Sequence, residues 1–279
     1  MTRAYFENKD LFETTVERKK TLFGSGNKKE TNFAVSQNGD FFVMNTSNIK
    51  KDINSYTVRV FNSKTLKLIY EKPYQTHKDR YFQSNDLFID NDGNVYALGK
   101  SFLSGKAQKK NKKANYTFVL NKVSSEQDQS IEIKLEDDHI QSLTIKNIND
   151  KFHLIGFYSN KNTNRVRGYC DFVINTESLT LENKIKNELP ESVYTDLYGI
   201  DSKSAKKKSE LSNFEIDFVL TDNEGNSYII SEEFYITTTY VSMGQFGGTT
   251  TTVYHYDDIF VLKINKEGQL VWGRSIFKR

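Results

Sequence analysis

Val60-Phe61-Asn62-Ser63-Lys64-Thr65-Leu66 is the stretch that decides the fold, because it joins the end of a β-rich run to a turn and recurs along the chain. Four further copies share its pattern of a strand end followed by polar turn residues, at 4–11, 119–122, 173–179 and 263–270. The residues that precede the turns are Phe6, Phe61, Leu120, Ile174 and Ile264, so the steps are 55, 59, 54 and 90 residues. Strand chemistry repeated at this spacing predicts an array of small sheets.

A second pattern precedes the first in each full unit and consists of two β-rich runs separated by a short turn. The turns are Asn38-Gly39, Asp92-Gly93, Asn149-Asp150 and Glu224-Gly225. Glycine accepts the positive φ that tight hairpins require, so the Asn-Gly, Asp-Gly and Glu-Gly turns predict hairpins. We therefore expect four up-and-down strands per unit, with this turn joining the inner pair and the Asn turn joining the outer pair.

Units of this kind, repeated radially, make a β-propeller in which each four-stranded antiparallel blade packs against its neighbours. The sequence predicts an all-β fold in a single domain, 1–279, with four full blades at about 31–72, 85–135, 140–186 and 213–277. Residues 2–23 are expected to supply an N-terminal half blade, and residues 188–211 an inter-blade insertion rich in helix formers. We interpret the array as an incomplete ring and the chain as a piece of a longer propeller. The alternative is a five-bladed ring closed by strands from the other terminus, for which no strands follow Arg279.

Composition narrows the functional classes. The net charge is only +3, from 39 basic and 36 acidic residues, which gives no overall case for binding nucleic acid. The basic runs at 109–113 and 206–208 are expected to be solvated loops. The single cysteine, Cys170, excludes an intrachain disulfide and is expected to be a small buried residue. No apolar run is long enough for a membrane span, so the sequence predicts none. The first residues lack the apolar stretch of a secretory signal, so no such signal is predicted in this sequence.

The turn Asp90-Asn91-Asp92-Gly93-Asn94-Val95-Tyr96 resembles the D-x-x-G-N-V-Y repeats of bacterial β-propellers, and residues 222–228 are a looser copy. More narrowly, the chain is similar to a group of uncharacterised bacterial propeller proteins. They share its Thr-rich hairpin before Asp257-Asp258-Ile259 and its closing pattern Trp272-x-x-x-Ile276-x-Lys278. The resemblance covers nearly all of the chain and implies a longer, exported parent at the periplasm or cell surface. Its motifs are structural ones and carry no catalytic residues.

The fourth predicted blade contains two Thr- and Tyr-rich arms, 235–241 and 249–256, around a glycine-rich tip. This pattern predicts a long hairpin, because Thr and Tyr suit an exposed strand pair. Its aromatic residues are candidates for stacking on a sugar or anchoring a partner protein: Tyr240, Phe246, Tyr254 and Tyr256. The alternative is a self-stabilised hairpin that covers the edge of its own blade.

Polar residues near matching places of the first strands are weaker candidates, for lining a central channel: Asn32, Asp86, Ser142 and Asp217. The alternative is that they cap a wet channel without binding anything. Asp90, Asp92 and Asn94 are spaced like the start of a calcium loop, but Ser101 stands where such a loop needs glutamate, so a hairpin turn is expected instead.

No local pattern predicts a catalytic residue, a metal site or a cofactor. The four histidines are scattered, and no nucleophile elbow, phosphate-binding loop or dinucleotide fingerprint is present. The leading hypothesis is a non-enzymatic propeller module that serves as a binding or scaffold surface for protein or glycan. The alternative is a propeller-type polysaccharide hydrolase or lyase, with acidic residues converging from several blades at the channel mouth.

Overall fold

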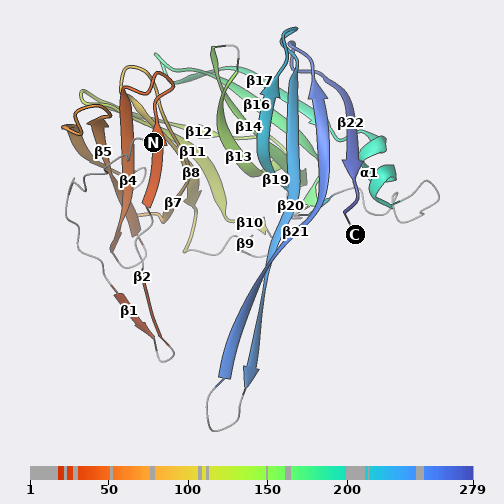
Figure 1. The fold of residues 1–279 in the computed structure, drawn as a ribbon, viewed down its shortest axis with the longest axis horizontal. Coiled ribbons are helices and arrows are strands. Elements are labelled where there is room, and N and C mark those ends of the chain that lie inside the picture. The colour runs from red at the N-terminus through yellow and green to blue at the C-terminus, as the bar shows by residue number, and fades with distance from the viewer. Residues whose placement is uncertain are drawn as a thin grey trace, which may run out of the picture. The chain divides into compact units, whose positions relative to one another are not determined.

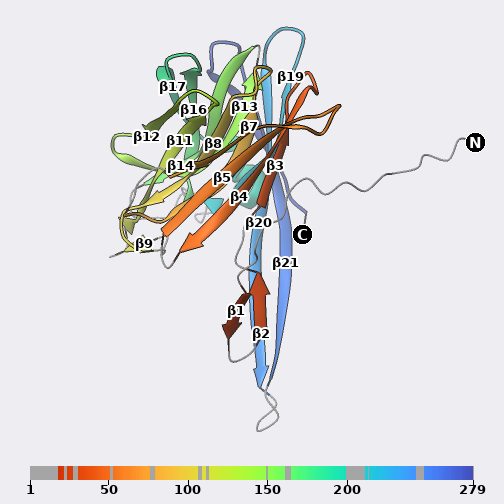
Figure 2. The ribbon, with the colours of Figure 1, turned by 90° about the vertical axis from the view of Figure 1, so that its left-hand side faces the viewer.

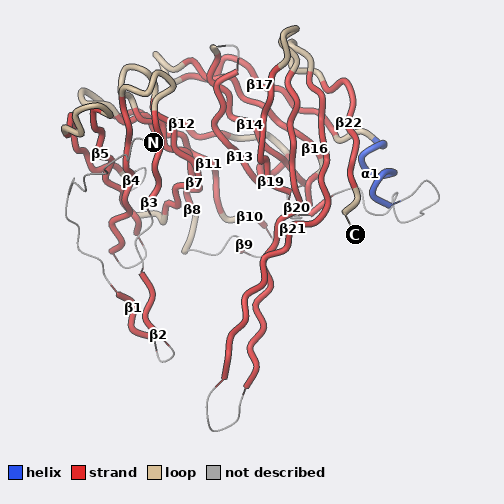
Figure 3. The backbone as a smooth tube through the Cα atoms, viewed as in Figure 1, coloured by secondary structure: helices blue, strands red, loops and turns tan. Residues whose placement is uncertain are grey.

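The structure is a computed structural model that describes residues 18–21, 24–27, 31–50, 53–75, 79–105, 109–110, 113–148, 150–160, 165–198, 211–212, 214–242 and 248–278. Strands dominate these ranges, in which α1 (Glu191–Tyr198) is the sole α-helix (Figure 3). The chain divides into two compact units, Met1–Gln108 with Asn115–Ile133, and Lys109–Ala114 with Lys134–Arg279.

The first unit contains two four-stranded antiparallel sheets, each a simple meander (Figure 1). The first sheet has the order β3 (Thr31–Val35), β4 (Phe41–Lys50), β5 (Ile53–Asn62) and β6 (Leu68–Tyr74). The second sheet is formed by β7 (Phe82–Ile89), β8 (Val95–Phe102), β11 (Tyr116–Val123) and β12 (Asp128–Ile133). A separate two-stranded pair joins β1 (Arg18–Thr21) to β2 (Gly24–Asn27).

The second unit repeats this organisation. The third sheet consists of β13 (Asp138–Ile148), β14 (Lys151–Asn160), β16 (Gly168–Asn175) and β17 (Thr180–Glu188). The fourth sheet consists of β19 (Phe214–Thr221), β20 (Ser227–Ser242), β21 (Gly248–Ile264) and β22 (Leu270–Ile276). Two short pairs complete the strands, β9 (Lys109–Lys110) with β10 (Lys113–Ala114), and β15 (Arg165–Val166) with β18 (Leu211–Ser212).

The repeated turn motif has a simple physical basis. The Asp90 carboxylate accepts hydrogen bonds from the backbone N–H of Asp92 and Asn94, at 3.0 and 2.8 Å, and from the Tyr96 hydroxyl at 3.2 Å. Gly93 has a φ of +82°, which the turn requires and glycine adopts without strain. Asp222 makes the same bonds to residues 224, 226 and 228. The motif therefore builds a hairpin turn, as predicted.

The second turn of each sheet is capped by the side chain that starts it. Asn62 and Asn175 each accept two backbone N–H bonds through Oδ1, and Asn265 accepts one. In the second sheet this residue is Ser124, whose Oγ accepts the Gln127 N–H at 3.1 Å. The sequence copy assigned to residues 119–122 was therefore placed three residues early, because Asn121 lies buried inside β11.

Successive sheets within each unit pack through opposite faces. In every sheet we number the residues of the second strand from zero. Position zero is the residue that pairs with the last residue before the capped turn, which is Phe42, Val95, Phe152 or Ser227. A residue of another strand takes the number of the second-strand residue at the same place in the register. The first sheet contributes odd positions such as Val43 to the shared core, whereas the second contributes even positions such as Ala97. Because equivalent residues face opposite ways, the two sheets are related as consecutive blades and not as the mirrored layers of a sandwich.

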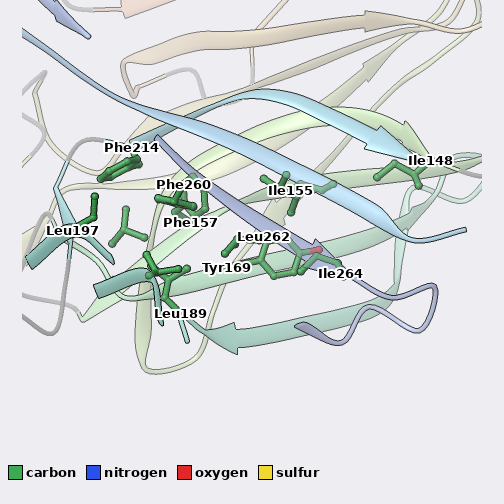
Figure 4. Close-up of a cluster of buried hydrophobic side chains, with 13 residues drawn as sticks. Ile148, Ile155, Phe157, Tyr169, Leu189, Leu197, Phe214, Phe260, Leu262 and Ile264 are labelled. Atoms are coloured by element: carbon green, nitrogen blue, oxygen red, sulfur yellow. The ribbon is translucent and has the colours of Figure 1, made fainter. Parts of the chain in front are cut away.

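The second unit follows the same rule. The third sheet contributes Ile155 and Phe157, at odd positions, and the fourth sheet contributes Leu262, at an even position (Figure 4). Ile229, which pairs with Leu262, belongs to the same core. Phe157 and Phe214 both pack their rings against Phe260. The predicted all-β, propeller-like fold of four-stranded antiparallel blades is confirmed.

Helix α1 lies in the predicted insertion and is clamped to β22. Arg274 donates two hydrogen bonds to Asp196, at 2.6 and 3.0 Å, and the Ser275 N–H donates a third at 3.0 Å. The Arg274 hydrogen bond lowers the pKa of Asp196 most, and the Ser275 N–H lowers it further. Of the half blade predicted at residues 2–23, only residues 18–21 are described, and they form β1.

Candidate binding hairpin

The predicted Thr/Tyr hairpin is formed by β20 and β21, which extend beyond the other two strands of the fourth sheet (Figures 1 and 2). β19 pairs with β20 only as far as Glu233, and β22 pairs with β21 only from Ile259. Beyond these residues, the described part of the hairpin is a two-stranded ribbon whose register runs from Phe234 opposite Tyr256 to Ser242 opposite Gly248.

A β-bulge separates this ribbon from the sheet. Glu232 pairs with Ile259 and Phe234 pairs with Tyr256, so β21 contains one more residue than β20 between the two pairs. The bulge shifts the alternation of β21 by one residue. Phe260 and Leu262 face the core, whereas Tyr254 and Tyr256 lie on the opposite side of the ribbon.

We define the tyrosine face as the side of the ribbon that carries Phe234, Ile236, Tyr240, Tyr254 and Tyr256. The register places them together, because Phe234 is opposite Tyr256, Ile236 is opposite Tyr254, and Tyr240 is opposite Thr250. Tyr240, Tyr254 and Tyr256 are 57%, 59% and 58% exposed. Three of the four residues predicted as a binding group therefore share one exposed face. The fourth, Phe246, lies outside the described residues.

The other side of the ribbon stiffens its base. The rings of Tyr235 and His255 stack with centroids 4.4 Å apart, and Thr237 Oγ1 lies 2.8 Å from His255 Nε2. The Tyr235 hydroxyl donates a hydrogen bond to Asp257 at 3.1 Å. These contacts tie both strands together immediately beyond the bulge.

Charge is excluded from the ribbon and concentrated at its base. Residues 234–256 contain no Asp, Glu, Lys or Arg, whereas Glu232, Glu233, Asp257 and Asp258 flank them. At the base, the Lys278 ammonium binds Glu232 and the Lys278 N–H donates to Asp258 at 3.1 Å. Charged side chains are the usual protection of exposed strand edges against pairing with other chains, and this ribbon lacks them.

The four channel candidates are only partly equivalent. Asn32 and Asp86 are half-buried and stand at the same register position of the first and second sheets, where Asp86 accepts the Leu87 N–H at 2.8 Å. Thr144 and Phe218 occupy this position in the third and fourth sheets. Ser142 stands two residues before this position, opposite Phe157, and Asp217 stands one residue before it, in a bulge, so their role in lining a channel stays a prediction.

Asp217 is the extra residue of the bulge in β19. Burial raises the pKa of its carboxyl, and the Glu232 carboxylate raises it further, while Lys278 acts in the opposite direction. Ser142 lies on β13, and its buried Oγ has no hydrogen-bond partner among the described residues.

A buried imidazole–carboxylate pair was missed by sequence reasoning. His153 Nδ1 lies 3.0 and 2.9 Å from the two carboxylate oxygens of Asp171, on the face of the third sheet that packs against the fourth. The two residues are 18 apart in sequence, on adjacent strands. Alternation along each strand was the available signal, because it places His153 on the same face as Ile155 and Asp171 on the same face as Tyr169. Within the described ranges, no group of three or more His, Cys, Asp or Glu is arranged to hold a metal ion.

Cys170 is fully buried in β16, as expected, and burial raises the pKa of its thiol. None of the helical residues that the structure describes forms a segment of the length and apolar character needed to cross a membrane.

No protein-family model matches the chain, and no curated protein matches it. A similar solved structure comes from a structural and mechanistic study of two prolyl endopeptidases, with a TM-score of 0.36 and 8% sequence identity. The match covers 88% of this chain and 33% of the other, so this chain spans about a third of that protein's length. A likeness this distant has no bearing on function.

Proposed function

We propose that this chain is a non-enzymatic binding module of propeller-like fold, whose β20–β21 hairpin captures a partner protein through the tyrosine face. The observation that carries the proposal is the register of the ribbon, which gathers Tyr240, Tyr254 and Tyr256 on one side, each more than half exposed. Tyrosine anchors a protein interface well, because it buries a large ring, loses little conformational entropy and keeps a hydroxyl for hydrogen bonding.

A protein partner suits the ribbon better than a glycan. Beyond Glu233 and before Ile259, neither outer edge of the ribbon is paired with another described strand. An extended peptide can add to such an edge through main-chain hydrogen bonds while its side chains contact one face of the ribbon. No carboxylate, which would bind sugar hydroxyls, accompanies the tyrosines between residues 234 and 256.

The test compares the wild-type chain with the triple variant Tyr240→Ser/Tyr254→Ser/Tyr256→Ser. Both are immobilised and probed with a displayed library of random peptides and, separately, with a glycan array. We expect the wild type to enrich extended, apolar peptides with micromolar affinity, and the triple variant to bind them at least about tenfold more weakly, since each lost anchor costs about 1 kcal/mol or more.

The matched control is Val241→Ser/Val253→Ser, which removes two exposed apolar side chains from the other side of the same ribbon. This variant should retain peptide binding. Equal binding by the triple variant, or binding of glycans in place of peptides, would refute the proposal.

A further inference from the structure

The fourth sheet has an apolar face that no described element covers. Its even positions pack against the third sheet, so its odd positions lie on the opposite, open face. On that face Phe218, Leu220 and Ile276 are 60%, 54% and 56% exposed, and Trp272 is 38% exposed. We call this set of four residues the open face of the fourth sheet.

The first sheet has an open face of the complementary kind. Its odd positions pack against the second sheet, so its even positions are left free of that core. Phe33 and Val35 are 62% and 51% exposed there, and Leu68 is 48% exposed. On the same face, Phe42 stacks on Phe61 with ring centroids 4.8 Å apart. We call Phe33, Val35 and Leu68 the open face of the first sheet.

These two faces match the packing rule that operates twice inside the chain. In both units the odd positions of one sheet pack against the even positions of the next sheet along the chain. The open face of the fourth sheet presents odd positions, and the open face of the first sheet presents even positions. A first sheet placed on a fourth sheet would therefore repeat the contact that the protein already makes between its first and second sheets and between its third and fourth.

We propose that the open face of the fourth sheet binds the open face of the first sheet of a second copy of this chain. Each copy carries one face of each kind, so the interface is head-to-tail, which closes into a ring or continues as a filament according to the rotation between copies. This inference does not depend on the hairpin, and the triple tyrosine variant should self-associate like the wild type.

The experiment measures the mass of the full chain in solution by sedimentation over a range of concentrations up to about 100 µM, where contacts of even modest affinity become populated. The variants are Val35→Glu, which places a charge on the open face of the first sheet, and Leu220→Glu, which does so on the fourth. The control is Leu103→Glu, which changes a residue that is 52% exposed and lies outside both faces. We expect the wild type and the control to associate and both face variants to be monomeric.

Mixing the two face variants is the decisive arm. Each has lost a different face, so Val35→Glu still offers a wild-type fourth sheet to the wild-type first sheet of Leu220→Glu. A head-to-tail interface predicts that the mixture forms a 1:1 complex, although neither component associates alone. A contact between two identical faces predicts a different result, because one variant would then associate by itself and the mixture would form no new species.

A second measurement covers the case in which a glutamate perturbs folding. Val35→Cys and Leu220→Cys are mixed with a short bis-maleimide, which reacts with little background because Cys170 is the only native cysteine and is fully buried. We expect a cross-linked heterodimer in the mixture. A wild-type chain that stays monomeric throughout, or a mixture that gives neither complex nor cross-link, would overturn the inference.

Discussion

Phe234 and Tyr256 lie directly opposite each other in the first pair beyond the bulge, with ring centroids 5.1 Å apart. Phe234 also stacks on Tyr254 at 6.4 Å and is half-buried, whereas both tyrosines are largely exposed. Phe234 is therefore the inner support on which two of the three exposed tyrosines rest.

Replacing this support should loosen the tyrosine face without unfolding the protein. We expect Phe234→Ala to lower the free energy of unfolding by no more than about 1 kcal/mol, because a cross-strand pair outside the core is worth that much at most. Amide hydrogen exchange within residues 234–256 should accelerate, while exchange in β14 and β16 should not change. Val253→Ala, on the other side of the ribbon, is the control, and equal exchange in both variants would contradict the supporting role.

The second prediction concerns the glycine of β14 beside the bulge of β13. A Cβ built on Gly156 would lie 1.7 Å from the Ser142 carbonyl oxygen, and one on Gly99, at the equivalent position of β8, would lie 2.3 Å from that of Gln83. Backbone atoms cannot move aside as a flexible side chain can. We expect Gly156→Ala to destabilise the protein by about 2 kcal/mol or more, measured by urea denaturation.

Ser231 provides the matched control, since it occupies the equivalent position of the fourth sheet and already carries a Cβ. Its buried Oγ has no hydrogen-bond partner among the described residues, so Ser231→Ala should be neutral or slightly stabilising. A neutral Gly156→Ala would mean that the strand relaxes at this bulge.

Most of the architecture was predictable, because turn chemistry and strand propensity act locally. The Gly turns, the Asn caps and the long hairpin can each be recognised in a few neighbouring residues. The error at 119–122 has a clear cause, since the cap of the second sheet is Ser124 and a search for asparagine stops at Asn121.

It was harder to predict on which face of its sheet each residue lies, because the strict alternation of side chains along a strand fails at every bulge. Counting by twos from Phe260 places Tyr254 and Tyr256 on the core side, and the extra residue of β21 reverses this. In the fourth sheet Asp217 is itself the extra residue of a bulge, so Phe218 takes the register position that matches Asn32 and Asp86. The His153–Asp171 pair depends on the register of two strands 18 residues apart, which no local pattern specifies.

The third prediction tests whether His153 and Asp171 act as one unit. Both side chains are nearly buried, with 13% and 5% of their surface exposed, so removing one takes from the other a contact that water cannot fully replace. We expect His153→Leu and Asp171→Leu each to cost about 2–4 kcal/mol, and the double variant to cost clearly less than their sum. Urea denaturation of the four proteins completes the cycle. Additive losses would show that the two groups are stabilised separately.

The last prediction is a pair of opposite pH dependences within the fourth sheet. Burial and Glu232 raise the pKa of Asp217, so the folded chain holds a proton there more tightly than the unfolded chain. The stability that this carboxyl contributes is present below its unfolded pKa and is lost as pH rises through the raised value.

Asp222 behaves in reverse, because the Asn226 side chain and backbone N–H groups lower its pKa. Its contribution is present above the unfolded pKa and is lost as pH falls through the lowered value.

Thermal unfolding between pH 3 and pH 7, a range of about 4 units around the ordinary carboxyl pKa, separates the two effects. At pH 7 we expect Asp217→Asn to be more stable than the wild type, by no more than about 0.5 kcal/mol because solvent screens this exposed group. Asp222→Asn should be less stable than the wild type at pH 7, and the difference should shrink toward pH 3. Shifts of the same sign in both variants would show that the surroundings of Asp217 do not disfavour its charged form.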